Sequence, residues 1–207
     1  GVMSKKPIIV FEGIEGSGKT HHISTISKYL TEKKIDHIKI REPGGNNNSE
    51  KIRKLILNNN SKLNSKSDLL LYLASRSENI EKLIKPNYKK KIILIDRFVD
   101  STIAYQHYGM GINKKLILNI NKFLLGNIKP DIVFLNLINK RNLLFRLNKR
   151  KNKNKYDKFN FNFYNKVQKG YIKLSKNKKM YFKIDSNNEL SCNKKIVINK
   201  IKKLIHV

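Results

Sequence analysis

The chain is poor in several residue types and patterns whose absence narrows its class. Cys192 is the single cysteine among 207 residues, so no disulfide can form within the chain and a reducing cytoplasm is the simplest setting. No apolar run reaches 18 residues and no charged-then-apolar leader is present, which argues against a membrane span or a signal peptide. No linker rich in proline, glycine or serine divides the chain. We expect one domain over residues 3–207 and treat residues 1–2 as a cloning remnant.

Acidic residues are also scarce, with 15 against 45 basic ones, which gives a net charge of +30. A basic excess of this size is typical of proteins that bind nucleic acid. Here the excess is lysine, 38 residues against 7 arginines, and it is spread along the chain together with abundant asparagine and isoleucine. We interpret it as the bias of an AT-rich genome acting on a tolerant surface. We therefore expect no specific nucleic-acid partner and no membrane partner.

Apolar runs alternate with stretches of helical periodicity. The near-continuous runs of Ile, Val, Leu and Phe are typical of strands buried on both faces of a parallel sheet. This alternation predicts an α/β doubly wound fold, in which ligands bind beyond the carboxyl ends of the strands. Strands are expected at 7–13, 37–42, 91–97, 131–137 and 180–185, and helices near 18–33, 50–58, 67–85, 113–125, 140–150, 158–176 and 193–205.

The stretch FEGIEGSGKT joins the first predicted strand to the first predicted helix. Residues 13–20 satisfy the pattern G-x-x-x-x-G-K-[ST], the phosphate-binding P-loop. Its glycines let successive backbone N–H groups point at one cluster of oxygens, and the helix N-terminus adds partial positive charge. Lys19 is expected to reach the β- and γ-phosphates and Thr20 to ligate Mg²⁺. The predicted nucleoside triphosphate site comprises Gly13, Ile14, Glu15, Gly16, Ser17, Gly18, Lys19 and Thr20.

The segment LLLYLASRSENIEKLIKP carries an arginine on an apolar helical face. On a helical wheel Leu69 and Leu73 belong to the core stripe, Arg76 falls inside that stripe, and Tyr72 borders it one turn earlier. An arginine in this position needs a partner, because its charge is not lost by deprotonation. The partner is either a core carboxylate or an acceptor at the edge of a base that stacks on the Tyr72 ring. These residues alone leave both interpretations open.

Two further stretches place polar residues at the ends of predicted strands. IDRFVDSTIAYQ puts Asp96 and Arg97 at the end of a buried strand, where Asp96 is placed to hold Mg²⁺ or its water and Arg97 to clamp a phosphate. A structural Asp–Arg pair is the alternative. REPGG follows the second strand with an extended turn at Pro43, and Arg53 comes next on EKIRK.

In this order and spacing, FEGIEGSGKT, REPGG, EKIR, LLLYLASR and DRFVDSTIAYQ closely resemble the bacterial-type thymidylate kinases (dTMP kinases), which are P-loop nucleoside monophosphate kinases. The likeness runs from residue 8 to about residue 190. It implies an α/β P-loop three-layer fold, a five-stranded parallel sheet with helices on both faces and a short basic lid. It also implies ATP as cosubstrate, Mg²⁺ as cofactor, and a homodimer.

The resemblance gives each matching residue an expected role. Glu15 meets the deoxyribose 3′-hydroxyl, and Tyr105 crowds the sugar C2′ position, which disfavours ribonucleotides. Arg53 and Arg97 hold the dTMP phosphate, and Tyr72 takes the place of the stacking aromatic. Four residues at the base edge and the turn beside it complete the predicted dTMP site: Pro43, Arg76, Thr102 and Gln106.

Gly16 occupies the P-loop position at which one subgroup of the family carries an arginine. The resemblance therefore implies that the catalytic positive charge comes from the lid RLNKRKNKNKYD, residues 146–157, as in the other subgroup. Arg146, Arg150 and Lys155 lie on its basic positions, and the first two are expected to contact ATP. The alternative is that this charge run is only a solvated face.

The expected reaction is transfer of the γ-phosphoryl group from ATP to dTMP, giving dTDP and ADP for dTTP synthesis. Such a transfer requires in-line alignment, neutralisation of the spreading charge and exclusion of water. Two alternatives remain: a P-loop kinase for a different acceptor, and a nucleic-acid-binding P-loop protein that uses the positive charge. The predicted catalytic residues are Lys19, Asp96, Arg97 and Arg150, with Mg²⁺ held through Thr20 and Asp96.

Overall fold

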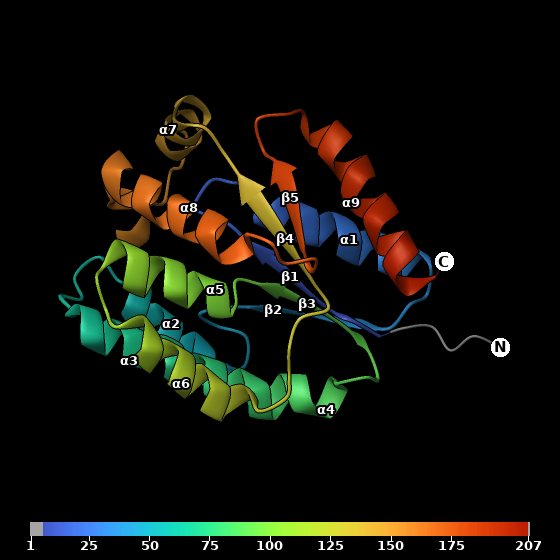
Figure 1. Ribbon diagram of the computed structural model, residues 1–207, viewed down its shortest axis with the longest axis horizontal. Helices are drawn as coiled ribbons and strands as arrows, with labels where there is room; N and C mark the ends of the chain where they lie inside the picture. The colour runs from blue at the N-terminus through green and yellow to red at the C-terminus, as the bar shows by residue number, and fades with distance from the viewer. Residues whose placement is uncertain (1–5, 207) are drawn as a thin grey trace.

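The computed structural model describes residues 6–206, so the expected remnant at residues 1–2 lies outside the described residues. Within that range five parallel strands form one sheet in the order β2-β3-β1-β4-β5 (Figure 1). All five predicted strands are confirmed, each to within one residue at either end. Their bounds are β1 (Ile8–Glu12), β2 (His37–Arg41), β3 (Ile92–Asp96), β4 (Ile132–Leu137) and β5 (Tyr181–Asp185).

Helices follow the strands, as the alternating pattern predicts. The α-helices are α1 (Lys19–Glu32), α2 (Asn47–Leu57), α3 (Ser65–Asn79), α4 (Lys85–Asn87), α5 (Val99–Thr102), α6 (Lys114–Leu125), α7 (Lys140–Asn148), α8 (Phe161–Ser175) and α9 (Leu190–Ile205). Two π-helical segments, η1 (Ile80–Ile84) and η2 (Ile103–Gly109), and one 3₁₀ helix, η3 (Lys155–Lys158), continue or separate them. No helix in the described part of the chain combines the length and the apolar character that crossing a membrane requires.

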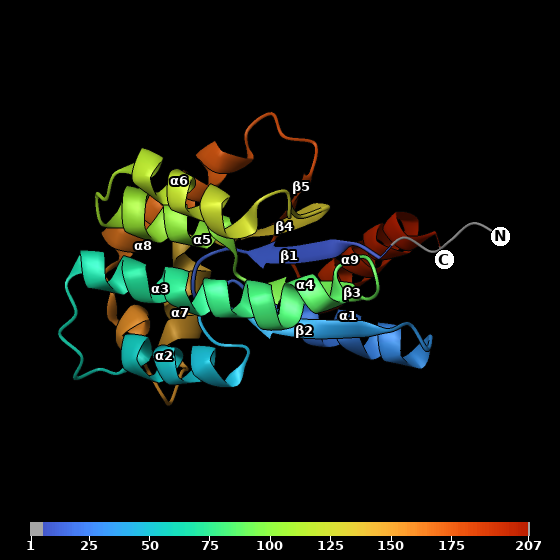
Figure 2. The same cartoon turned by 90° about the horizontal axis from the view of Figure 1, so that it is seen from below.

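The sheet is covered on both faces because its three central strands, β1, β3 and β4, are apolar on both sides. Alternate residues of β1 point in opposite directions, so Phe11 packs in the core formed with α1 and α9 while Val10 packs in the core formed with η1. Figures 1 and 2 show α1 and α9 together on one face and α3, α4 and α6 on the other. The predicted α/β arrangement with helices on both faces of a five-stranded parallel sheet is confirmed.

Helix boundaries differ from the prediction where burial or capping overrides periodicity. Residues 99–109 form α5 and η2, a helical stretch that the sequence pattern does not indicate. Because Ser101 to Gln106 are all buried, this stretch has no solvent-exposed face, and its sequence therefore shows no amphipathic period. Helix α8 begins three residues later than residue 158, since the Asn160 side chain caps it by accepting from the Phe163 N–H at 2.9 Å.

His22 is a buried histidine that makes stability depend on pH. Its ring stacks on Phe11 with 6.4 Å between ring centroids, and burial, followed by the charge of His21, lowers its pKa to about 4. Between this value and the unfolded value near 6.5, the unfolded chain binds more protons than the native protein, so stability falls as the pH falls through this window. Two and a half pKa units correspond to about 3 kcal/mol.

The free energy of unfolding should fall between pH 7 and pH 4 in both proteins. We expect this fall to be about 2–3 kcal/mol smaller in His22→Phe than in the unsubstituted protein. Urea unfolding at a series of pH values measures both losses, with each protein at pH 7 as its own reference. Equal losses in the two proteins would show that His22 is not the group responsible.

Candidate active site

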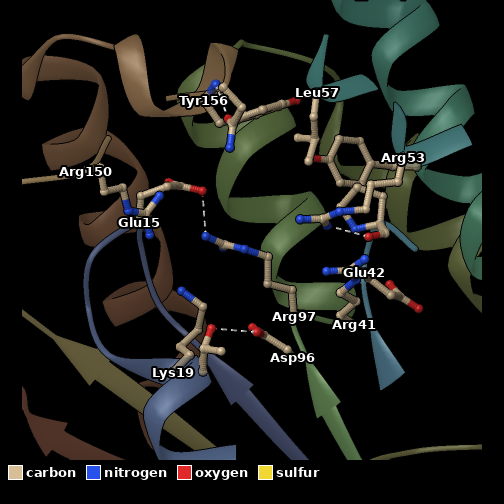
Figure 3. A pocket seen from close by; sticks show the side chains of 14 residues that line it. Glu15, Lys19, Arg41, Glu42, Arg53, Leu57, Asp96, Arg97, Arg150 and Tyr156 are labelled. Atoms are coloured by element: carbon tan, nitrogen blue, oxygen red, sulfur yellow. Dashed lines mark hydrogen bonds and ion pairs between the residues drawn. The ribbon is translucent and has the colours of Figure 1, made fainter. Parts of the chain in front are cut away.

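Three adjoining cavities lie at the carboxyl ends of the strands. The central cavity, about 200 Å³, lies between the P-loop, Asp96, α2 and the lid (Figure 3). The inner cavity, about 20 Å³, continues from it between α3 and η2. The outer cavity, about 290 Å³, lies beside Lys19 and Thr20 and reaches Arg146 and Leu190. The predicted site residues that line the central cavity are Glu15, Lys19, Thr20, Pro43, Arg53, Tyr72, Asp96, Arg97 and Arg150.

The P-loop, residues 13–20, joins β1 to α1 as the motif predicts. Gly13 has φ 143°, and a Cβ on it would lie 2.6 Å from the Asn136 carbonyl oxygen, so this position requires glycine. The Lys19 ammonium donates to the carbonyl oxygens of Gly13 and Ile14, each at 2.9 Å. Burial, and then the neighbouring charge of Arg97, lowers the pKa of Lys19 to about 8. The loop therefore holds a buried cation at the start of α1, where a phosphate gains most from it.

Arg97 connects the P-loop to the inner cavity. Its backbone lies in the left-handed region at φ 68°, an uncommon conformation for an arginine that is frequent at functional sites. Its guanidinium donates to Glu15 Oε1 at 2.6 Å and to the Gly13 carbonyl at 2.9 Å. The Tyr105 hydroxyl donates to the other oxygen of Glu15. Glu15, Arg97 and Tyr105 thus form one hydrogen-bonded unit that lines the inner cavity, and Figure 3 shows the link between Arg97 and Glu15.

Thr20 and Asp96, the predicted metal ligands, lie next to each other in the wall of the central cavity. Thr20 Oγ1 donates to Asp96 Oδ2 at 3.3 Å, and Asp96 Oδ1 is buried without a hydrogen-bond partner in the described part of the chain. One hydroxyl and one carboxylate, with room for phosphate oxygens and water, is the donor set that Mg²⁺ uses in kinases. Residues 6–206 contain no cluster of three or more His, Cys, Asp or Glu that could hold a metal by itself. The pair fits Mg²⁺ held jointly with a nucleotide.

Four arginines line the central cavity, each from a different element, and the first, Arg41, ends β2 and pairs with Glu50 at 2.8 Å. Arg53 comes from α2, Arg97 from the turn after β3 and Arg150 from the lid (Figure 3). Arg53 is oriented by a 2.6 Å hydrogen bond to the Pro43 carbonyl oxygen, which places the REPGG turn in the wall. Planar guanidinium groups on several sides of one cavity are suited to bind phosphate oxygens. The arrangement can bind two phosphate groups close together.

Of the three residues predicted to contact the base edge, one lines one of the three cavities described and two do not. Gln106 lines the inner cavity, and its Nε2 is buried without a hydrogen-bond partner among the residues described. Thr102 and Arg76 lie outside the described linings of the three cavities. Arg76 is 1% exposed and donates to Glu42 Oε2 at 2.6 and 2.8 Å and to Asn121 Oδ1 at 2.6 Å. The core carboxylate partner is therefore present, and base contact by Arg76 and Thr102 stays a prediction.

The three lid residues that the resemblance singles out point in three directions. Arg146 donates to the Gly16 carbonyl at 2.9 Å and to the Ser186 carbonyl at 2.7 Å, so it packs on the P-loop and lines the outer cavity. Arg150 lines both the central and the outer cavity and pairs with buried Asp157. Lys155 turns away from all three cavities and pairs with Asp68 of α3 at 2.6 Å.

Comparison with known proteins agrees with this geometry. The thymidylate kinase family model matches residues 11–197. The chain belongs to the thymidylate kinase family. It is 43% identical over 183 residues to the thymidylate kinase of Thermosipho africanus, covering 88% of this chain and 90% of that protein. It is also 43% identical over 171 residues to that of Wolbachia pipientis wMel, covering 81% and 84%.

A solved thymidylate kinase structure shares the fold. The crystal structure of the enzyme from Ehrlichia chaffeensis superposes with a TM-score of 0.76 at 32% identity, covering 96% of this chain and 97% of that chain. The sheet topology and the phosphate-binding edge described above are thus those of a thymidylate kinase family member.

Several residues that line this site are not among the site residues predicted from the sequence. Glu42 and Leu57 line the central cavity, and Tyr156 lines both the central and the inner cavity. The sequence does carry a signal for Glu42: it is a polar residue that directly follows β2, and ligands bind at the carboxyl ends of parallel strands. Tyr156 has no comparable signal, because it lies in a polar, lysine-rich stretch.

Proposed function

We propose that this protein transfers the γ-phosphoryl group of ATP to dTMP, giving dTDP and ADP in dTTP synthesis. The observation that carries the proposal is the convergence of Arg53, Arg97 and Arg150 beside Lys19 around one cavity. Membership of the thymidylate kinase family supports dTMP as the acceptor. The ATP phosphates then lie on the P-loop and the dTMP phosphate between Arg53 and Arg97, with the base in the inner cavity.

The chain's own residues align two anions and neutralise the charge that spreads in the transition state. A dTMP phosphate oxygen forms the new bond to the γ-phosphorus while the bond to the bridging β–γ oxygen breaks and ADP departs. Lys19 and Arg97 are held by short contacts to the Gly13 carbonyl, so both are fixed relative to the loop. Arg150 reaches the boundary between the central and outer cavities, where the transferred group passes.

Mg²⁺ belongs to this proposal as the cofactor held by Thr20 and Asp96. When bound there, it would neutralise part of the negative charge on the phosphates. The buried Asp96 Oδ1 without a partner and the Thr20 hydroxyl 3.3 Å from Asp96 Oδ2 support these two residues as its ligands. Removal of divalent cations by a chelator tests the requirement, and full activity in its presence would contradict it.

A coupled assay of ADP release tests the acceptor. The assay compares dTMP, dUMP, dCMP and single-stranded DNA at equal concentration with ATP and Mg²⁺. ADP release with dTMP supports the proposal. Release stimulated by dCMP instead would indicate another acceptor, and release stimulated by single-stranded DNA would favour the nucleic-acid-binding alternative.

Within that assay dUMP is expected to be a poorer substrate than dTMP. The missing methyl group in a fitted pocket changes kcat/KM by about 10- to 200-fold, which corresponds to 1–3 kcal/mol. Initial rates at low acceptor concentration give kcat/KM for both nucleotides. Equal values would remove the case for selectivity toward thymine.

We also propose that the protein is a cytoplasmic homodimer, with residues 3–207 as one domain and 146–157 as its lid. Phe123, Leu116 and Leu70 are exposed apolar side chains on α6 and α3, two helices in contact with each other, and they support a dimer surface there. Cys192 is exposed and is the single cysteine of the sequence, so the chain makes no internal disulfide, which supports a reducing compartment. Sedimentation as a monomer at micromolar concentration would contradict the dimer, and cell fractionation tests the location.

A further inference from the structure

Asp68 is a buried carboxylate on α3 with two partners in the lid. Its Oδ1 accepts from Lys155 Nζ at 2.6 Å, and its Oδ2 accepts from the Tyr156 hydroxyl. Asp68 is 87 and 88 residues from these partners in sequence, and its side chain is only 3% exposed. A buried carboxylate of this kind is stable only when paired, so α3 and the lid are held together at this point.

Tyr156 lies at the junction of the central and inner cavities. Its ring meets those of Tyr72 and Tyr105 edge-on, with centroid separations of 6.0 and 5.8 Å. It lines both cavities, so it forms the side of the inner cavity that the lid contributes. The inner cavity, about 20 Å³, holds little more than one water molecule, so a wall must move when a pyrimidine enters.

The segment η3 joins this wall to the phosphate side of the site. Asp157, next to Tyr156, pairs with Arg150 and caps η3 together with Asn154. One short helix thus carries three links: Lys155 and Tyr156 to Asp68, and Asp157 to Arg150. A displacement of η3 shifts the base wall and the lid arginine together.

The spacing on α3 places Asp68 on the same stripe as the base-stacking residue. Asp68 and Tyr72 are four residues apart and therefore neighbours on one helical face. Asp68 also lies in the first turn of α3, where a carboxylate is favoured by the helix dipole. A single rigid helix thereby fixes both the anchor of the lid and the opposite wall of the cavity.

We propose that Asp68 is a positioning residue for the phosphoryl transfer: it anchors the lid through Lys155 and Tyr156, so that Tyr156 closes the base cavity while Arg150 faces the phosphates. This inference rests on the proposed function, because it takes the inner cavity as the site of the dTMP base. Asp68 contacts neither nucleotide in this arrangement and acts through Tyr156 and η3.

Steady-state kinetics of Asp68→Ala and Tyr156→Phe test the anchor. We expect the KM for dTMP to rise about 10-fold or more in Asp68→Ala and several-fold in Tyr156→Phe, with a smaller change in the KM for ATP. Hydrogen exchange of residues 149–160 is expected to accelerate in both variants, a readout that a role confined to global stability would not move. Glu78→Ala is the matched control, a carboxylate on α3 that pairs with Lys82 and Asn48 instead of the lid, and it should keep wild-type values.

The outcomes separate the anchor from the proposed function. Folded variants with the wild-type KM for dTMP and wild-type exchange would overturn the anchor. If Asp68→Ala does not fold, Tyr156→Phe decides, since it removes one hydroxyl and keeps the ring. A wild-type protein without dTMP-dependent ADP release would overturn the proposed function, whereas exchange in Tyr156→Phe would still report on the contact between lid and α3.

Discussion

Arg150→Ala is expected to lower kcat by about 10³-fold, with little change in the Kd for dTMP, as loss of an arginine that stabilises transition-state charge does. Arg150 lines both the central and the outer cavity. The P-loop supplies no arginine of its own, because Gly16 stands where one subgroup of the family carries that residue. The effect falls on kcat because the spreading charge exists only in the transition state. Single-turnover rates and dTMP titration measure the two quantities separately.

Lys151→Ala is the matched control for Arg150, since Lys151 is an exposed lid cation that lines none of the three cavities described. A neighbouring lysine can replace the charge without the planar fork, which leaves partial activity. If Arg150→Ala keeps more than about a tenth of the activity, Arg146→Ala and the double variant follow. A fully active double variant would contradict a lid-supplied arginine.

Arg76→Ala is expected to destabilise the fold by about 3–5 kcal/mol, the usual effect of breaking a buried ion pair from one side. Arg76 and Glu42 are both almost fully buried, and their closest contact is 2.6 Å. Burial already raises the pKa of Glu42, and without Arg76 its carboxyl loses the charge that opposes this rise. Urea unfolding at pH 7 measures the loss.

The double variant Glu42→Gln with Arg76→Met distinguishes an ion-pair effect from a lost base contact. Removal of both charges is expected to recover much of the stability, because a packed neutral pair replaces the buried ions. Weak dTMP binding in this folded variant would support the predicted contact between Arg76 and the base. Wild-type stability in Arg76→Ala would show that the ion pair contributes nothing to the fold.

Much of the site follows from local sequence because the chemistry is carried by contiguous motifs. Strands β1, β3 and β4 are recognisable in the sequence as apolar runs, and the glycine spacing of the P-loop predicts its conformation. Asp96 ends the buried strand β3 and Arg97 follows it, so the parallel sheet necessarily brings them to the same edge as Lys19. The predicted convergence of P-loop, strand end and Arg53 around one cavity agrees with the structure.

Local pattern misses elements that are buried on all sides. The α5–η2 stretch shows no amphipathic period, since its residues from Ser101 to Gln106 are enclosed. A helix is recognised by periodicity only when one of its faces is exposed to solvent. This helical stretch packs against α8 and in the hydrophobic core, so it has no such face. Its helical form is nevertheless what turns Tyr105 and Gln106 toward the inner cavity.

By itself the sequence determined the α/β class, the strand positions and the family, because each depends on short-range patterns and on the spacing of motifs. Only the tertiary structure decided the partners of the charged side chains. Arg76 could pair with a base or a carboxylate, and Glu42, 34 residues away, settles its core partner through the placement of α3 beside the end of β2. Likewise Asp68 meets Tyr156 across 88 residues. Such pairs depend on strand order and helix packing, which no local period encodes.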